Sequence, residues 1–311
     1  MPNYQGVWNI STQYQNASGW PVFVPPIGLF GGGSTSSVNI IDQVTISSTG
    51  NASDFGDLTV ARYGLSSFSS STRGCWAGGF VGGTVQNVID YVTIASAGNA
   101  ADFGDLNVSR GYVSGTGSET RGLIIGGISG STYYNNIQYV TIASTGNASD
   151  FGDLTLARGY TGSCSSPTRA VTGGGRTSGS TTNNNIDYVT IASTGNSTDF
   201  GDLTAGRSYL SAVSSATRGV FVSGIGSNTT MDYVTIASAG NATDFGDCDS
   251  GLQTYSGAAS SSIRGVIANG SADTDIQYIT IASTGNSTDF GNLTNARDYL
   301  AGCSNAHGGL Q

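Results

Sequence analysis

The sequence predicts an all-β fold, in which six similar units form the blades of a closed β-propeller. The main observation is an internal repeat: the tripeptide Asp-Phe-Gly occurs six times in 311 residues, at intervals of 45 to 49 residues. A period of this length, made of short β-type runs, is typical of propeller blades, which bury their faces against their neighbours. The six copies begin at Asp54, Asp102, Asp150, Asp199, Asp244 and Asp289.

The amino-acid composition is that of a β protein. Glycine accounts for 48 of the 311 residues, and Val, Ile, Thr and Tyr fill the apolar runs, which favours short strands joined by tight turns. No segment has sustained helical periodicity. No run of 18 apolar residues is present and the first residues lack a basic and then apolar pattern, so we expect neither membrane insertion nor a cleaved secretion signal.

Each repeat predicts four strands. The Gly- and Ser-rich run Tyr63 to Thr72 suits an inner strand near a crowded axis. The apolar run Gly74 to Gly79 predicts the second strand, and the alternating run Ile89 to Ser96 predicts the third. A turn containing Gly and Asn then leads to Asp-Phe-Gly-Asp-Leu, which predicts a short outer strand.

The two ends of the repeat region predict how the ring closes. The first copy, residues 27–58, has the second, third and outer strands but no inner strand. Residues 298–306 form an inner strand with no partner strands after it. We expect these two fragments to combine into one blade, because closure pairs the strand edges that an open stack would expose.

Charged residues follow the repeat closely. The chain has a net charge of -9, no Lys, one Glu (Glu119) and one His (His307). Ten of the eleven Arg recur at two repeat positions, after Asp-Phe-Gly-Asp-Leu-Thr and in a Thr-Arg-Gly-like element, and only Arg176 lies outside them. A group that recurs once per blade fits a structural role, so we expect these Arg to bond Asp carboxylates or carbonyl oxygens between blades.

The order of these features resembles the kelch repeat. An Arg, a strand of small residues, Arg-Gly, Gly-Gly, a Tyr-bearing strand and an aromatic residue before Leu follow one another in the kelch order, with Phe where kelch repeats usually carry Trp. The similarity covers residues 27–309 and implies a six-bladed kelch-like propeller. Ser223-Gly224 and Asn269-Gly270 weaken the double glycine, and residues 249–253 replace Leu-Thr-x-x-Arg, so we expect local irregularity there.

Residues 1–26 lie outside the repeat and differ from it in composition. They contain Trp8 and Trp20, further aromatic residues and several Pro. Aromatic side chains serve equally well as a cover over the propeller base and as an anchor on a partner, so both alternatives stay open.

Two stretches resemble virion proteins. The opening Tyr-Gln-Gly-Val-Trp is similar to the start of repeat-rich virion proteins encoded by tailed phages, especially phages of marine cyanobacteria. The repeated Tyr-Val-Thr-Ile-Ala-Ser-Thr-Gly-Asn-Ala-x-Asp-Phe-Gly-Asp-Leu is similar to repeats of the same proteins. The resemblance implies a tail fibre, knob or capsid decoration on the released virion, with residues 1–26 contacting other virion proteins.

The residue inventory argues against catalysis. With one His, one Glu and no Lys, acid–base or nucleophilic chemistry would rest on Asp, Tyr, Cys or Arg, so we expect no enzyme and no cofactor. We expect no metal site, because each Gly-Asn-Ala-x-Asp-Phe-Gly-Asp element offers too few oxygens for Ca²⁺ and reads more simply as a turn. The acidic net charge argues against nucleic-acid binding. The four Cys form no Cys-x-x-Cys pair and are expected to be free and mostly buried.

The loops of the two faces differ. The turns between third and outer strands are nearly constant, whereas the loops between second and third strands vary in length and composition. Recognition is therefore expected on the variable face, with drift of unconstrained loops as the alternative. The candidate ligand-binding residues are Tyr133, Tyr134 and Arg176, because aromatic and Arg side chains dominate binding hot spots.

Together these observations favour a non-enzymatic virion component. Its expected partners are other virion proteins and a glycan or protein on the host surface. The alternatives are a purely structural scaffold within the virion and an intracellular kelch-type adaptor.

Overall fold

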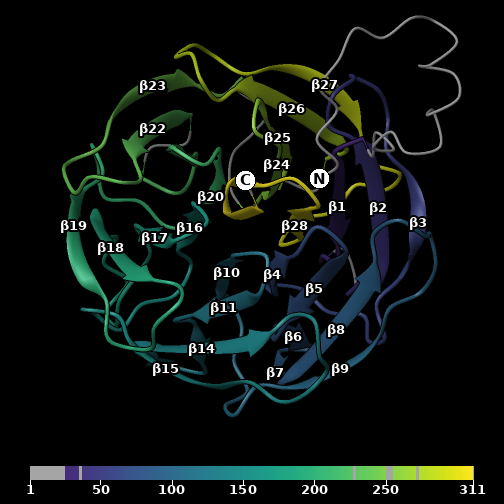
Figure 1. Cartoon of the computed structure of the whole chain (residues 1–311), viewed down its shortest axis with the longest axis horizontal. Helices are drawn as coiled ribbons and strands as arrows, with labels where there is room; N and C mark the ends of the chain where they lie inside the picture. The colour runs from purple at the N-terminus through teal and green to yellow at the C-terminus, as the bar shows by residue number, and fades with distance from the viewer. Residues whose placement is uncertain (1–24, 35–36, 227–228, 250–254, 271–272, 311) are drawn as a thin grey trace, which may run out of the picture.

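The computed structural model describes residues 25–34, 37–226, 229–249, 255–270 and 273–310. It contains six four-stranded antiparallel sheets arranged around a central axis (Figure 1). The predicted fold class, a six-bladed β-propeller closed by the C-terminal strand, is confirmed. The candidate anchors Trp8 and Trp20 lie outside the described residues.

The strands follow one another from the axis outward in every blade. Blade one contains β28 (Ala301–Ser304), β1 (Ile27–Gly31), β2 (Ile40–Thr45) and β3 (Ser53–Asp57). Blade two contains β4 (Ser66–Ser69), β5 (Arg73–Ala77), β8 (Val88–Thr93) and β9 (Ala101–Asp105), and blade three contains β10 (Ser114–Gly117), β11 (Arg121–Ile125), β14 (Asn136–Thr141) and β15 (Ser149–Asp153). Two short hairpins extend these blades, β6 (Phe80–Val81) with β7 (Thr84–Val85) and β12 (Ile128–Ser129) with β13 (Thr132–Tyr133).

The other three blades repeat the same order. Blade four contains β16 (Gly162–Ser165), β17 (Arg169–Gly173), β18 (Asn185–Thr190) and β19 (Thr198–Asp202). Blade five contains β20 (Ser211–Ser214), β21 (Arg218–Val222), β22 (Thr230–Thr235) and β23 (Thr243–Asp247). Blade six contains β24 (Gly257–Ser260), β25 (Arg264–Ala268), β26 (Asp275–Thr280) and β27 (Thr288–Asn292).

The composite blade forms as expected. In Figure 1 the yellow β28 lies beside the purple β1, and the two pair antiparallel from Gly28 opposite Ser304 to Gly31 opposite Ala301. Trp76 of blade two also holds this strand, because its indole N–H donates to the carbonyl oxygen of Ala301 at 3.1 Å. The inner strands are shorter than the sequence predicts, since the residues before them form links between blades.

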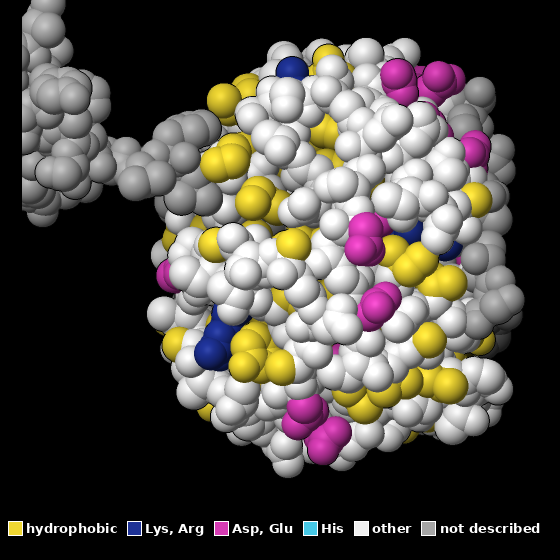
Figure 2. Space-filling view, turned by 90° about the vertical axis from the view of Figure 1, so that its right-hand side faces the viewer, with side chains coloured by type: hydrophobic (Ala, Val, Ile, Leu, Met, Phe, Trp, Pro, Cys, Tyr) yellow, Lys and Arg dark blue, Asp and Glu magenta, His cyan; other side chains and the backbone are white. Residues whose placement is uncertain are grey.

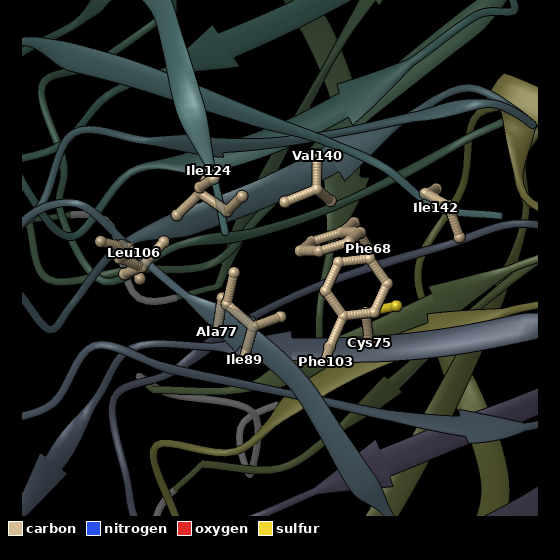
Figure 3. Packing of buried hydrophobic residues seen from close by; sticks show 11 residues of the cluster. Phe68, Cys75, Ala77, Ile89, Phe103, Leu106, Ile124, Val140 and Ile142 are labelled. Carbon is tan, nitrogen blue, oxygen red and sulfur yellow. The ribbon is translucent and has the colours of Figure 1, made fainter. Parts of the chain in front are cut away.

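The hydrophobic core is divided among the interfaces between neighbouring blades. Six clusters of buried residues occur, one for each interface of the ring. Figure 3 shows the cluster between blades two and three, where Phe68 and Phe103 pack near Ile124 and Val140. Cys75 lies in the same cluster, and all four cysteines are buried and free, as the sequence predicts.

Contact between neighbouring blades explains the Gly of Asp-Phe-Gly. Gly152 has a φ of 147°, and a Cβ at this position would lie 2.3 Å from the carbonyl oxygen of Gly195 in the next blade. The turn of that blade also bonds to the outer strand, since the N–H of Asp153 donates to Oδ1 of Asn196 at 3.0 Å. Equivalent contacts recur at the other five copies. The Asn of each turn is therefore a link between blades.

The Arg that follow the outer-strand motif Asp-Phe-Gly-Asp-Leu-Thr form buried ion pairs. Arg158 lies 3.1 Å from the carboxylate of Asp187, and both side chains are excluded from solvent. The hydroxyl of Thr155, which follows the outer strand of blade three, donates to the same carboxylate at 2.7 Å. Three further pairs have this arrangement: Arg62 with Asp90, Arg207 with Asp232, and Arg297 with Asp42. The predicted Arg–Asp bonds are therefore present in four blades.

The Arg of the Thr-Arg-Gly-like element join neighbouring blades by donating hydrogen bonds to carbonyl oxygens. Arg121 of blade three donates to the carbonyl of Ile191 in blade four at 2.8 Å, and its guanidinium lies 4.4 Å from the ring centre of Tyr139. Equivalent bonds and ring contacts are made by Arg73, Arg169, Arg218 and Arg264. These contacts confirm the predicted Arg–carbonyl bonds between blades.

Blade three departs from the ion-pair pattern. Gln138 occupies the position of the pairing Asp, and the buried Arg110 donates instead to the carbonyl oxygens of Asn136 at 2.9 Å and Ile124 at 3.4 Å. Burial lowers the pKa of Arg110 to about 10, and the neighbouring Tyr134 offsets part of this effect. Arg110 is thus buried without a carboxylate to stabilise its charge, unlike the four Arg that form ion pairs.

On the side of the molecule that Figure 2 shows, charged side chains are few. Most of this surface is uncharged and polar, with acidic side chains in small separate groups and hydrophobic atoms between them. Within the described ranges, no helix has the length and apolar character needed to span a membrane.

Candidate functional site

The links between blades bring aromatic side chains to the axis. They lie on the variable face, the face of the ring that carries the variable loops between second and third strands. Each link from an outer strand to the next inner strand carries one tyrosine. The N–H of Tyr160 donates to the carbonyl of Tyr112 at 3.0 Å, and that of Tyr209 donates to the carbonyl of Tyr160 at 2.8 Å. The same type of bond runs from Tyr255 to Tyr209, from Tyr299 to Tyr255, from Gly64 to Tyr299 and from Tyr112 to Gly64. Six backbone hydrogen bonds therefore form a closed ring around the axis. We call Tyr63, Tyr112, Tyr160, Tyr209, Tyr255 and Tyr299 the tyrosine crown.

Five crown residues have an unusual backbone conformation. Tyr112, Tyr160, Tyr209, Tyr255 and Tyr299 adopt φ values of 50° to 67°, in the left-handed region. In blade two the order of residues is reversed, so that Gly64 takes this conformation and the crown residue precedes it. A non-Gly residue in this region costs on the order of 1–3 kcal/mol, and such strain concentrates at functional sites. Five strained residues of one type at one place make the crown a candidate functional site.

The rings of the crown meet over the axis. Neighbouring ring centroids from Tyr112 round to Tyr299 are 4.0–4.5 Å apart. Tyr112, Tyr209 and Tyr299, from alternate blades, form an inner triangle with centroid separations of 5.4, 6.1 and 6.3 Å. All six side chains are half-buried, so the crown closes the channel and presents aromatic surface outward.

The crown hydroxyls lie near one another. Tyr209 influences the pKa of Tyr160, and Tyr112 and Tyr255 influence the pKa of Tyr299. Burial raises the pKa of the phenols of Tyr112, Tyr160, Tyr209 and Tyr299 above the ordinary tyrosine value. They therefore stay protonated at neutral pH and provide neutral donors and acceptors.

The fold brings two of the three sequence-predicted site residues to the edge of the crown. Arg176 is half-buried and lies close enough to Tyr209 to influence its pKa. Tyr133 lies close enough to Tyr160 to affect its pKa. Tyr134 instead lies beside the buried Arg110, so part of its role is structural.

Two further residues at the edge were not predicted. Phe80 stacks on Tyr63 with ring centroids 5.5 Å apart and lies 4.7 Å from Tyr112. Asp298 precedes the crown residue Tyr299, its backbone carbonyl accepts the N–H of Ser34 at 2.8 Å, and burial raises the pKa of its carboxyl group. The edge thus carries a cation in blade four and a carboxyl group before blade one.

The hollow at the crown is small. Its volume is about 80 Å³, and the side chains of Leu65, Val113, Leu210 and Leu300 line it beneath the tyrosines. Pockets that enclose small molecules measure about 300–1,000 Å³. A ligand of the crown would therefore lie on it rather than within it.

The opposite opening of the channel is closed by the C-terminal segment. Inner-strand Ser hydroxyls donate in sequence to neighbouring carbonyls, from Ser69 to Ser304, Ser260, Ser214, Ser165 and finally Gly117. Gly117 has no hydroxyl to donate back to Ser69, and Nε2 of His307 bonds to the Ser69 carbonyl instead, at 3.0 Å. Nδ1 of His307 accepts the N–H of Gly309 at 3.0 Å, which assigns the proton to Nε2. The single His completes this hydrogen-bond ring.

Acidification is expected to loosen this cap. Burial lowers the pKa of His307 below its ordinary value of 6.5, while nearby Glu119 acts in the opposite sense. A lowered pKa means that the stabilisation is present above about pH 6.5 and is lost as the pH falls through the pKa of the folded state, because a protonated Nδ1 cannot accept the Gly309 N–H. Melting curves should show a larger loss of stability between about pH 7.5 and pH 5 in the wild type than in His307→Gln. An equal loss in both would contradict this role.

A larger hollow lies on the opposite face of the ring, the uniform face, which carries the constant turns. It measures about 760 Å³, and Ser, Thr and Asn residues line it together with Pro26, Ile263 and Arg264. Its one charged group, Arg264, already donates to the carbonyl of Ile46. The hollow therefore offers no free charge to a ligand.

The described part of the chain holds no group of three or more His, Cys, Asp or Glu arranged to bind a metal ion. The Asn and Asp oxygens considered for Ca²⁺ belong to the turns, where each Asn accepts a backbone N–H of the preceding blade. This use of the Asn agrees with the turn interpretation of the sequence.

Neither a comparison with models of protein families nor a comparison with curated proteins finds a match for this chain. The kelch and virion resemblances therefore rest on sequence motifs alone. What the structure itself shows is a six-bladed propeller, a fold consistent with a structural or interaction module.

The crown is the main functional feature that sequence reasoning missed. A signal was present, because Tyr follows Arg by two positions in four links, as in Arg110-Gly-Tyr112 and Arg158-Gly-Tyr160. These Tyr were assigned to inner strands, where one aromatic residue per repeat does not stand out. Their convergence depends on ring closure, which places all the links around one axis.

Proposed function

We propose that this chain is a non-enzymatic recognition module of a phage virion, in a fibre, knob or capsid decoration, whose variable-loop face contacts a glycan or protein on the host surface. The observation that carries the recognition role is the tyrosine crown. It presents half-buried aromatic side chains in a strained conformation on the face that also carries the variable loops. Aromatic and Arg side chains are the groups that dominate binding hot spots.

The two faces of the ring differ in a way that supports this assignment. On the uniform face, turns and Ser hydroxyls are engaged in hydrogen bonds between blades, and His307 closes the axis. On the variable face, Arg176 stands outside the two repeat positions of the scaffold Arg and lies near the half-buried crown residue Tyr209. An Arg and aromatic side chains together on one face favour binding over a purely structural role.

The virion part of the proposal is supported by the resemblance of the repeats and of the opening residues. We expect residues 1–26 to attach the propeller to other virion proteins. Mass spectrometry of purified particles should detect this chain, and particles assembled with a chain lacking residues 1–26 should lack it. A chain found only in the cytoplasm of infected cells would instead favour the adaptor alternative.

Replacing both loop tyrosines should weaken attachment. The variant Tyr133→Ser/Tyr134→Ser is expected to bind host cells at least about tenfold more weakly, because it removes two aromatic contacts of the variable face. The measurement is competition by free propeller against particle attachment. Ile263→Ser, which changes a 64% exposed side chain on the opposite face, is the matched control. Attachment unaffected by the loop variant and by free propeller would favour the scaffold alternative.

A further inference from the structure

We propose that the tyrosine crown binds the terminal residue of a glycan, and that this residue is an acidic pyranose, a six-membered sugar ring that bears a carboxylate. The inference rests on the proposed function, because it names the ligand class of the same face. Three features carry it: the size of the aromatic patch, the charge of Arg176 and the carboxyl group of Asp298.

The aromatic patch matches one sugar ring in width. The inner triangle of Tyr112, Tyr209 and Tyr299 has sides of 5.4, 6.1 and 6.3 Å between ring centroids. The C–H face of a pyranose is apolar and stacks on aromatic rings, while its hydroxyls point outward around the edge. The hollow of about 80 Å³ at the crown is too small to enclose a sugar, so the sugar would stack on the crown.

Arg176 supplies a cation at the edge of this patch. The other Arg are engaged in the scaffold, either fully buried or bonded to carbonyl oxygens of a neighbouring blade. Arg176 is half-buried and lies close enough to Tyr209 to influence its pKa. A guanidinium is a strong match for a carboxylate, which accepts charge-assisted hydrogen bonds.

Asp298 sets the orientation of the sugar. It precedes the inner strand of blade one, whereas Arg176 belongs to blade four, so the two lie on opposite sides of the six-bladed ring. The half-buried carboxyl group of Asp298 would repel a carboxylate on its side of the ring. The acidic group of the sugar would therefore point toward Arg176 and its hydroxyls toward Asp298.

The opposite charge on the ligand is less favourable. A quaternary ammonium also stacks on aromatic faces and would be attracted by Asp298. Arg176, however, lies near the crown residue Tyr209 and would repel such a cation. The charge beside the rings therefore selects an anion.

Binding of single sugars to the full chain tests the proposal. Isothermal titration or saturation-transfer NMR would compare glucuronate and N-acetylneuraminate with glucose and with choline. We expect the two acidic sugars to bind at least about tenfold more tightly than glucose, as a gained charge-assisted hydrogen bond implies. Arg176→Gln should remove this preference while leaving the affinity for glucose and the melting temperature unchanged. The matched control, Ile263→Ser, should leave all affinities unchanged.

Several results would overturn the proposal. These are equal affinity for glucuronate and glucose, tighter binding of choline, and an acid preference that survives in Arg176→Gln. If no sugar binds while Tyr133→Ser/Tyr134→Ser still weakens attachment to cells, the ligand class is wrong and the recognition function stands with a protein ligand. If attachment is also unaffected, both proposals fail.

Discussion

Removal of residues 298–311 should destroy the closed ring. The deletion takes away β28, which pairs with β1 over four residues, and exposes that edge of blade one to solvent. It also leaves the buried indole N–H of Trp76 without its acceptor on Ala301. An exposed inner edge next to apolar interfaces promotes pairing with other chains. We therefore expect loss of cooperative unfolding or oligomerisation, measured by melting curves and by size-exclusion chromatography with light scattering.

A shorter deletion separates closure from capping. Removing residues 308–311 retains β28 and takes away only the segment that lies over the axis. This variant should remain monodisperse and lose only part of its thermal stability. If the longer deletion were as stable and as monodisperse as the full chain, closure of the ring by β28 would not be what holds the blades together.

Removing the carboxylate of one buried ion pair should have the second largest effect. Asp187→Ala leaves the fully buried Arg158 without its charged partner and removes the acceptor for Thr155. Breaking one side of a buried pair costs about 3–5 kcal/mol, because an uncompensated charge remains in the interior. The free energy of unfolding, measured by urea denaturation, should fall by that amount.

Two controls test the cause of this loss. Asp102→Ala changes an exposed Asp of the Asp-Phe-Gly motif and should alter stability by less than about 0.5 kcal/mol. Replacing both partners, as in Arg158→Met/Asp187→Leu, removes the unpaired charge and should recover much of the stability. Equal losses in Asp187→Ala and Asp102→Ala would show that burial of the pair does not matter.

The blade structure could be predicted from sequence because its determinants are local and repeated. Alternating apolar residues define each third strand, Gly and Asn define the turn after it, and six copies reinforce each assignment. The missing inner strand at the start and the unpaired one at the end predict the composite blade. The ends of the strands could be predicted less accurately, because residues such as Tyr63-Gly64 form links between blades and do not belong to the inner strand.

The partners of charged residues could be predicted only by class. The periodicity of Arg and Asp indicates a scaffold role, and four ion pairs have the expected Asp. That Arg110 lacks such a partner follows from Gln138, which is visible in the sequence but meaningful only once the two positions are known to meet. In blade two the equivalent contact, between Arg62 and Asp90, joins residues 28 positions apart.

The sequence by itself determined the fold class, the number of blades, the closing strand and the structural character of the Arg and Asn repeats, because each depends on patterns within one repeat. Only the tertiary structure decided which face can bind and where. The tyrosines of the crown are about 45 residues apart in the chain, and His307 is 238 residues from the Ser69 carbonyl that it meets. Such contacts arise when the ring closes and brings every repeat to one axis, so no local pattern can specify them.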